Sequence, residues 1–260
     1  MILLGCCGTT DTYESIATMG YDYVELSARQ IMELSDEQFE EFLKIYNPEK
    51  LPCRGFNDYC SKDYPIVGPG CGSEACVEYA RKLCKRGHAL GIRTIGIGAP
   101  AARTVPEGYD KAQADADMVA FLKTSCKIAE EYNITLLLEA VHKYLCNYMT
   151  TTPEAFKMVE ELKIPNLGIV LDYYHAMVME EDLHDFGYVM PYVRHLHIST
   201  DLEDHKRGYL GEEDVPLLKQ LLAEAAAAGY EGGISVEAGN ANLAADGASC
   251  QQWMRKALPA

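Results

Sequence analysis

The sequence predicts an α/β fold, a single (β/α)8 TIM barrel domain over residues 1–260, and three observations carry that prediction. Strand-like and helix-like segments alternate from one end of the chain to the other, which is typical of parallel α/β folds. About eight such pairs occupy a length close to the ~250 residues usual for this barrel. No linker rich in Pro, Gly or Ser divides the chain, and no block of charge does so either. An open doubly wound sheet shows the same alternation and is the alternative fold.

Eight short runs of apolar and β-branched residues are the predicted strands. The last four are nearly continuous apolar runs that end in a charged or polar residue, as expected for parallel strands buried on both faces. The runs lie near residues 1–4, 22–26, 53–57, 93–98, 135–141, 167–172, 193–198 and 233–238.

The segments between these runs contain helix signals. Ser35 opens SDEQFEEFLKIY as a capping residue, and acidic residues follow it in the first turn, as helix N-termini prefer. Pro153 lies in the first turn of PEAFKMVEELK, with Thr152 before it as the expected cap. Further helices are predicted over residues 73–90, 110–132 and 214–228 and around Trp253, the only tryptophan.

The composition excludes several classes of protein. The chain has 39 acidic and 23 basic side chains, a formal net charge of −16, so nucleic acid is not expected as a partner. No apolar run approaches ~18 residues and no targeting segment opens the chain, so neither a membrane association nor secretion is expected. The ten cysteines form no C-x-x-C pair, which argues against a zinc knuckle or a redox motif. We therefore expect a cytoplasmic protein with reduced, mostly buried thiols.

Four chemically active residues end the last four predicted strands. Glu139 follows LLL, Asp172 follows GIVL, His197 ends RHLH, and Glu237 follows ISV. In a (β/α)8 barrel these ends meet at one mouth, where three carboxylates repel one another unless a cation neutralises them. The set predicts one divalent metal ion, with Mn²⁺ favoured and Co²⁺, Mg²⁺ or Zn²⁺ as alternatives. Taken singly, each residue could instead be a helix cap or a member of a surface ion pair.

Two further features of the sequence resemble functional motifs, a glycine pattern and a second histidine near His197. The stretch from Gly96 to Ala101 has the form G-x-G-x-x-A, but its glycines fall inside a predicted strand, so we do not interpret it as a dinucleotide turn. His195 lies two residues before His197 and therefore on the same side of the strand, nearer the floor of the barrel. It is either a packed core residue or part of the site.

With these residues placed, the chain resembles the xylose isomerase-like TIM barrel superfamily, in particular its sugar isomerase and epimerase branch. That branch includes hydroxypyruvate isomerases and tagatose/psicose 3-epimerases. The likeness covers nearly the whole chain, from GYDYVEL to GYEGGISVE, and is densest in LLLEAVHKYLCNYMTT, NLGIVLDYYHAM and VRHLHIS. The order and spacing of the segments make it specific.

The resemblance implies a role for six residues. The family's metal ligands fall on Glu139, Asp172, His197 and Glu237, its substrate-orienting histidine on His175 and its substrate-binding arginine on Arg207. It also implies that the metal chelates neighbouring carbonyl and hydroxyl oxygens, while the two glutamates remove and return a carbon-bound proton through a cis-enediolate. This scheme is chemically sound, because a divalent ion polarises a carbonyl and a carboxylate can act as a base beside it.

The chain departs from the family pattern after Glu139. The usual E-P-L-N-R followed by a second Glu is replaced by E-A-V-H-K-Y-L, which places His142, Lys143 and Leu145 at the altered positions. In the epimerases that second Glu contacts the substrate near the site of proton transfer. His142 is a candidate general base in its place, because histidine titrates near neutral pH, and a neutral packing role is the alternative.

These inferences together predict a divalent-metal-dependent isomerase or epimerase acting on a small carbohydrate or keto acid. A dehydratase or lyase of the same superfamily, acting on keto-inositols or 3-keto-glycosides, is the alternative. An endonuclease IV-type enzyme is disfavoured by the acidic charge and the seven histidines. A ligand-binding protein with a structural metal is a further alternative. The sequence leaves open whether the chain forms a homo-oligomer.

Overall fold

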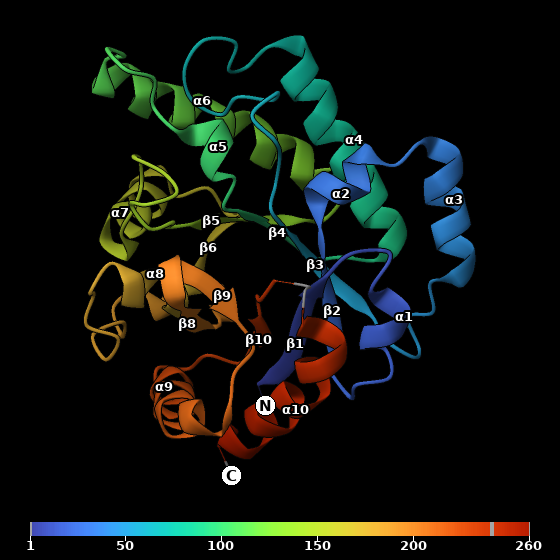
Figure 1. The fold of residues 1–260 in the computed structure, drawn as a ribbon. Helices are drawn as coiled ribbons and strands as arrows, with labels where there is room; N and C mark the ends of the chain where they lie inside the picture. The colour runs from blue at the N-terminus through green and yellow to red at the C-terminus, as the bar shows by residue number, and fades with distance from the viewer. Residues whose placement is uncertain (1, 240–241, 260) are drawn as a thin grey trace.

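Parallel strands close into a barrel in the computed structural model, which describes residues 2–239 and 242–259. Within these ranges the strand order around the barrel is β1-β10-β7-β6-β5-β4-β3-β2, and the helices lie outside it (Figure 1). Because β1 pairs with both β2 and β10, the sheet has no edge, which confirms the (β/α)8 barrel and excludes the open sheet. The barrel strands are β1 (Leu3–Gly8), β2 (Tyr23–Ser27), β3 (Cys53–Asn57), β4 (Thr94–Ile97), β5 (Thr135–Glu139), β6 (Leu167–Asp172), β7 (Val193–Ile198) and β10 (Gly233–Val236).

The predicted strands agree with the observed ones except at some ends. The first strand was expected near residues 1–4, but β1 continues to Gly8 because Cys6 and Cys7 behave as small buried residues. The fifth strand was expected to reach residue 141, but β5 ends at Glu139. Shifts of this size are usual, since side-chain burial rather than local pattern decides where pairing stops.

The larger helices begin and end at the expected signals. Ser35 caps α3, because its Oγ accepts a hydrogen bond from the backbone N–H of Gln38. The side-chain oxygen of Gln38 in turn accepts one from the backbone N–H of Ser35. Gly91 ends α4 in the left-handed conformation that glycine accepts readily. Thr152 is the first residue of α7 rather than its cap. The helices are α1 (Tyr13–Ile16), α2 (Ala28–Glu33), α3 (Asp36–Ile45), α4 (Glu74–Leu90), α5 (Pro100–Arg103), α6 (Lys111–Glu130), α7 (Thr152–Leu162), α8 (Tyr173–Val178), α9 (Val215–Ala227) and α10 (Leu243–Ala257).

A small hairpin after β7 was not predicted. Strands β8 (Thr200–Leu202) and β9 (Lys206–Gly208) pair antiparallel and lie apart from the barrel sheet (Figure 1). Three residues per strand are too few for a periodic signal. The hairpin matters because β9 carries Arg207 to the mouth of the barrel.

The floor of the barrel is built around one aromatic ring. Tyr23 points inward from β2, and a Cβ added to Gly5 or Gly233 would lie within 2.6 Å of its ring or hydroxyl. The two glycines on β1 and β10 therefore make room for this ring. Above it, inward-facing positions recur every second residue along each strand, so His195 and His197 lie on the same side of β7, with their ring centroids 4.9 Å apart.

All ten cysteines are free thiols, and eight of them are buried, as the sequence predicted. Among the described residues, no helix combines the length and the apolar character needed to cross a bilayer.

Candidate metal centre and active site

The four predicted ligands converge at the C-terminal mouth of the barrel. Glu139 and Asp172 are the last residues of β5 and β6, His197 lies near the end of β7, and Glu237 directly follows β10. Nδ1 of His197 lies 3.1 Å from Glu139 Oε1, 3.2 Å from Glu237 Oε2 and 3.9 Å from Asp172 Oδ2. One ligand atom from each residue falls within 4.8 Å of the others, so the four side chains could hold one ion.

The chemistry of this donor set fits a divalent cation. Glu139, Asp172 and His197 are almost completely buried, and Glu237 is about a quarter exposed. Three carboxylates in so small a volume require positive charge, because buried like charges are costly unless they are neutralised. Oxygen donors joined by one imidazole suit Mn²⁺, Mg²⁺, Co²⁺ or Zn²⁺.

The carboxylates of the cluster have different proton affinities. Burial is the main cause that raises the pKa of Glu139 to about 7, and the nearby charge of Glu237 adds to it. Burial acts in the same direction on Glu237, but Arg207 and His197 outweigh it and lower that pKa to about 2. Arg207 also holds the pKa of Asp172 below its usual value against the effect of burial. The site thus pairs one carboxyl that binds a proton near neutrality with one that stays ionised.

Arg207 and His175 form the side of the site next to Asp172. Nη2 of Arg207 donates to Oδ2 of Asp172 and lies 3.2 Å from Oε2 of Glu237, and its guanidinium stacks over the ring of Tyr174. The same nitrogen donates to Nε2 of His175 at 2.8 Å. Since a guanidinium only donates, Nε2 of His175 carries a lone pair. Burial is the main cause that lowers the pKa of His175 to about 3, so the ring is neutral. Both residues line the cavity at the mouth.

His142 lies behind His175 rather than in that cavity. Its ring packs edge-on against His175 with centroids 4.9 Å apart, and it is 1% exposed. Among the described residues, neither ring nitrogen has a hydrogen-bond partner. Burial, followed by the charge of Arg207, lowers its pKa. The structure therefore brings the other predicted site residues together but places His142 one layer away, and its role as a general base stays a prediction.

The cavity has a volume of about 320 Å³ and two unlike sides. The segments that follow β4 and β5 provide an apolar wall that includes Ala99, Val141 and Leu145. Gly98 belongs to this wall, and a Cβ at that position would lie 2.5 Å from Oε2 of Glu139. The glycine of the rejected dinucleotide pattern thus makes room for a predicted metal ligand.

The opposite side comes from β1, β3 and the segments that follow β2 and β3, and sequence reasoning missed it. Cys7, Asn57 and the Arg29–Asp58 ion pair line the cavity there. Nδ2 of Asn57 donates to Oε1 of Glu237 at 3.0 Å. The sequence did contain a signal for Asn57, because this residue ends its strand just as Asp172 does. Asn57 has no charge, however, so it was not recognised as a site residue.

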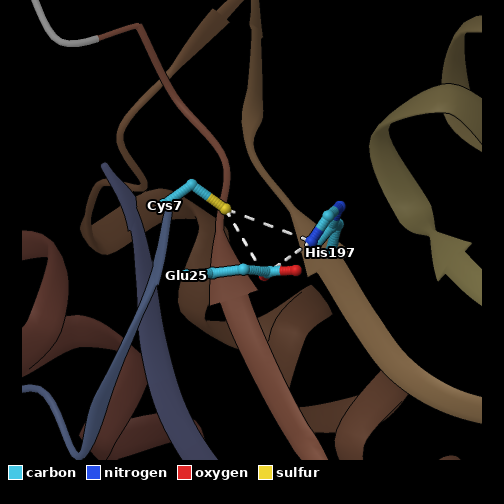
Figure 2. A group of neighbouring side chains, drawn as sticks. All are labelled: Cys7, Glu25 and His197. Atoms are coloured by element: carbon cyan, nitrogen blue, oxygen red, sulfur yellow. Dashed lines mark hydrogen bonds and ion pairs between the residues drawn. The ribbon is translucent and has the colours of Figure 1, made fainter. Parts of the chain in front are cut away.

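A second cluster lies beneath the first and shares His197 with it. Glu25, on β2, lies with Cys7 and His197 at the floor of the site (Figure 2). Oε2 of Glu25 is 2.9 Å from Nε2 of His197 and 2.8 Å from Nε2 of His195. His195 also contacts Oγ of Ser235 at 3.1 Å, so it belongs to this buried network. The signal for Glu25 was a lone acidic residue inside the run YVEL.

Comparison with known proteins assigns the family. A family model described as xylose isomerase-like TIM barrel matches residues 13–257. The chain belongs to the xylose isomerase-like TIM barrel family. The resemblance inferred from the sequence motifs is thereby confirmed.

The chain is similar to two sugar or keto-acid isomerising enzymes in sequence and to a further epimerase in structure. An L-ribulose 3-epimerase from Methylomonas sp. (strain DH-1) is 28% identical over 220 residues, which cover 80% of this chain and 71% of that protein. A hydroxypyruvate isomerase from Escherichia coli (strain K12) is 28% identical over 114 residues, 43% of this chain and 40% of that protein. The crystal structure of a 3-keto-D-glucoside 4-epimerase from E. coli superposes with a TM-score of 0.78 at 16% identity, covering 98% of this chain and 99% of the other. The last match supports the fold alone.

Proposed function

We propose that this protein is a divalent-metal-dependent isomerase or epimerase of a small sugar or keto acid. The convergence of Glu139, Asp172, His197 and Glu237 on one cavity carries the proposal. Mn²⁺ is the ion we propose, held by one atom of each of these four side chains. The names of the ribulose epimerase and the hydroxypyruvate isomerase give the same reaction class.

The two glutamates are suited to moving a proton on and off carbon. A bound divalent ion would polarise the substrate carbonyl and so acidify the neighbouring C–H. Glu237 can take that proton through an oxygen that does not bind the ion, and Asn57 and Arg207 lie beside its carboxylate. Glu139 can return a proton to carbon in the same way. Strands β5 and β10 are separated by β6 and β7 in the barrel, so the two carboxyls approach the cavity from different sides.

His175 and Arg207 would orient the substrate and stabilise charge. Arg207 is cationic and reaches the cavity from the β8–β9 hairpin, where it can bind the oxygen that becomes negative as the enediolate forms. His175 is held by Arg207 and faces the same space.

Solvent deuterium exchange tests the proposal. The full chain, stripped of metal and reloaded with Mn²⁺, is incubated in D₂O with ketoses, hydroxypyruvate, keto-inositols and 3-keto-glycosides, and NMR and mass spectrometry follow each compound. We expect deuterium at a carbon next to a carbonyl in one substrate class, with conversion to an isomer and no other change of mass. The metal-stripped protein is the control. Metal-dependent binding of a compound with no exchange into it would overturn the proposal in favour of a ligand-binding protein.

A dehydratase or lyase is the second candidate, and Leu145 favours it. This apolar side chain lines the cavity at the position where the epimerases resembled by the sequence carry a second glutamate. Without a carboxylate on that wall to return a proton to carbon, the enediolate could instead expel a group, which takes its proton from another residue of the site. Exchange accompanied by loss of water or of an aglycone would identify this reaction.

A further inference from the structure

A buried carboxylate beneath the proposed metal site has no part in the chemistry described so far. Glu25 is 2% exposed and lies on β2, which β1 and β10 separate from β7. An ionised group so deep in a barrel is costly unless it is paired, and Glu25 is paired with two imidazoles through one oxygen. Both imidazoles belong to β7, and one of them is the proposed ligand His197.

The two nitrogens of His197 face opposite clusters. Nδ1 lies against Glu139 and Glu237. Nε2 points to Glu25 (Figure 2). A neutral imidazole that gives the lone pair of one nitrogen to a metal carries its proton on the other nitrogen. That nitrogen must then donate a hydrogen bond, and Oε2 of Glu25, 2.9 Å away, can only accept one when ionised.

We propose that Glu25 is a positioning residue that keeps the proton of His197 on Nε2 and thereby directs Nδ1 at the metal. This inference rests on the proposed metal site. A carboxylate that accepts the second N–H of a metal-binding histidine orients the ring and makes it a better ligand. The remaining contacts of Glu25 hold the carboxylate in place, because the thiol of Cys7 and Nε2 of His195 converge on the same oxygen.

The same geometry allows one competing interpretation, a second metal ion held by Cys7, Glu25 and His197. Their ligand atoms are separated by 3.6 Å, 4.0 Å and 2.9 Å. Such an ion would need the lone pairs of both nitrogens of His197 at once, and therefore a fully deprotonated ring. Hydrogen bonding accounts for the contacts without this requirement.

The test compares Glu25→Gln with Ser235→Ala in the full chain. Calorimetric titration of the metal-stripped proteins with Mn²⁺ should show binding weakened by about 10–100-fold in Glu25→Gln, the range found when such outer partners are lost. Ser235→Ala removes a neighbour of His195 but leaves the bond between Glu25 and His197, so its affinity should match the wild type. Circular dichroism establishes that both variants are folded. Wild-type affinity in folded Glu25→Gln would overturn the proposal.

A measurement on the wild type keeps the proposal testable if Glu25→Gln does not fold. In ¹⁵N NMR of the Mg²⁺-loaded protein, His197 should show a protonated Nε2, and the opposite tautomer would overturn the proposal. Zn²⁺ and Co²⁺ titrations should saturate at one ion per chain. Two ions per chain, with a thiolate-to-cobalt absorption band that disappears in Cys7→Ala, would replace the proposal by the second metal site. None of these readouts needs a substrate, so a failed exchange experiment leaves them interpretable.

Discussion

The two halves of the barrel contribute different chemistry to one cavity. The later strands, β5, β6, β7 and β10, supply every proposed metal ligand at or just beyond their ends. The earlier strands, β1 to β3, supply groups that contact those ligands, such as Asn57 on Glu237 and Glu25 on His197. The proposed ligands of the later half end apolar runs and were visible in the sequence, whereas the groups of the earlier half are recognised only by their contacts with those ligands. The surroundings of each proposed ligand therefore include strands that are remote in sequence.

The largest expected effect comes from the later half. Glu237→Gln removes the proposed base and one carboxylate ligand, so turnover and deuterium exchange should fall by on the order of 10²–10⁴-fold. Exchange rates measured by NMR in D₂O check this, with the exposed change Glu40→Gln on α3 as the control. A folded Glu237→Gln protein that exchanges at the wild-type rate would show that Glu237 is not the base.

A larger side chain just after β4 tests whether metal binding depends on the position of the Glu139 carboxylate. Gly98→Ala places a Cβ 2.5 Å from Oε2 of Glu139, so the carboxylate must move, and Mn²⁺ affinity should weaken by about 10-fold or more. Gly96→Ala is the matched control, because its Cβ would lie no closer than 3.4 Å to a neighbour, Cγ2 of Val170. Calorimetry on both variants gives the comparison. Equal affinities would mean that Glu139 is not held where the metal needs it.

The earlier half can be probed at Asn57. Asn57→Leu removes the hydrogen bond to Oε1 of Glu237, and a bond to a charged group contributes about 1.5–3 kcal/mol. We expect kcat to fall by about 10-fold and the acid limb of the kcat–pH profile to move to higher pH, because the ionised form of Glu237 loses a donor. Asn57→Asp preserves the size but adds a negative charge, so its acid limb should move further. If the kcat–pH profiles of both variants superimpose on that of the wild type, Asn57 does not influence the ionisation of Glu237.

The smallest expected effect is a dependence of stability on pH. The pKa of Glu139 is raised to about 7, so the folded metal-free protein holds an extra proton between about pH 4.5 and 7. Its contribution to the free energy of unfolding is therefore present at low pH and declines as the pH rises, by at most about 1.4 kcal/mol per unit. The lowered pKa of His175 acts in the opposite direction, so wild type must be compared with Glu139→Gln.

Urea unfolding in a chelator gives this difference at several pH values. The stability of wild type relative to Glu139→Gln should fall from pH 4.5 to 7. Added Mn²⁺ should stabilise wild type more at pH 7 than at pH 5, because metal ligands must lose their protons. A relative stability that is constant or that rises with pH would contradict the assignment of the raised pKa to Glu139.

The sequence alone determined the alternation of strands and helices, and with it the four residues at the later strand ends. Apolar runs of the right length identify buried parallel strands, and a charged residue that interrupts such a run is conspicuous. His175 and Arg207 came from the family resemblance, and both face the cavity.

Only the tertiary structure decided which groups surround those residues. Glu25 and Asn57 contact ligands 172 and 180 positions away in the chain, and no local pattern encodes such contacts. His142 follows Glu139 by three residues, and only the turn after β5 determines that its ring packs against His175. The physical reason is barrel closure. Strand periodicity determines which side chains point inward, but only the pairing of β1 with β10 determines which of them meet.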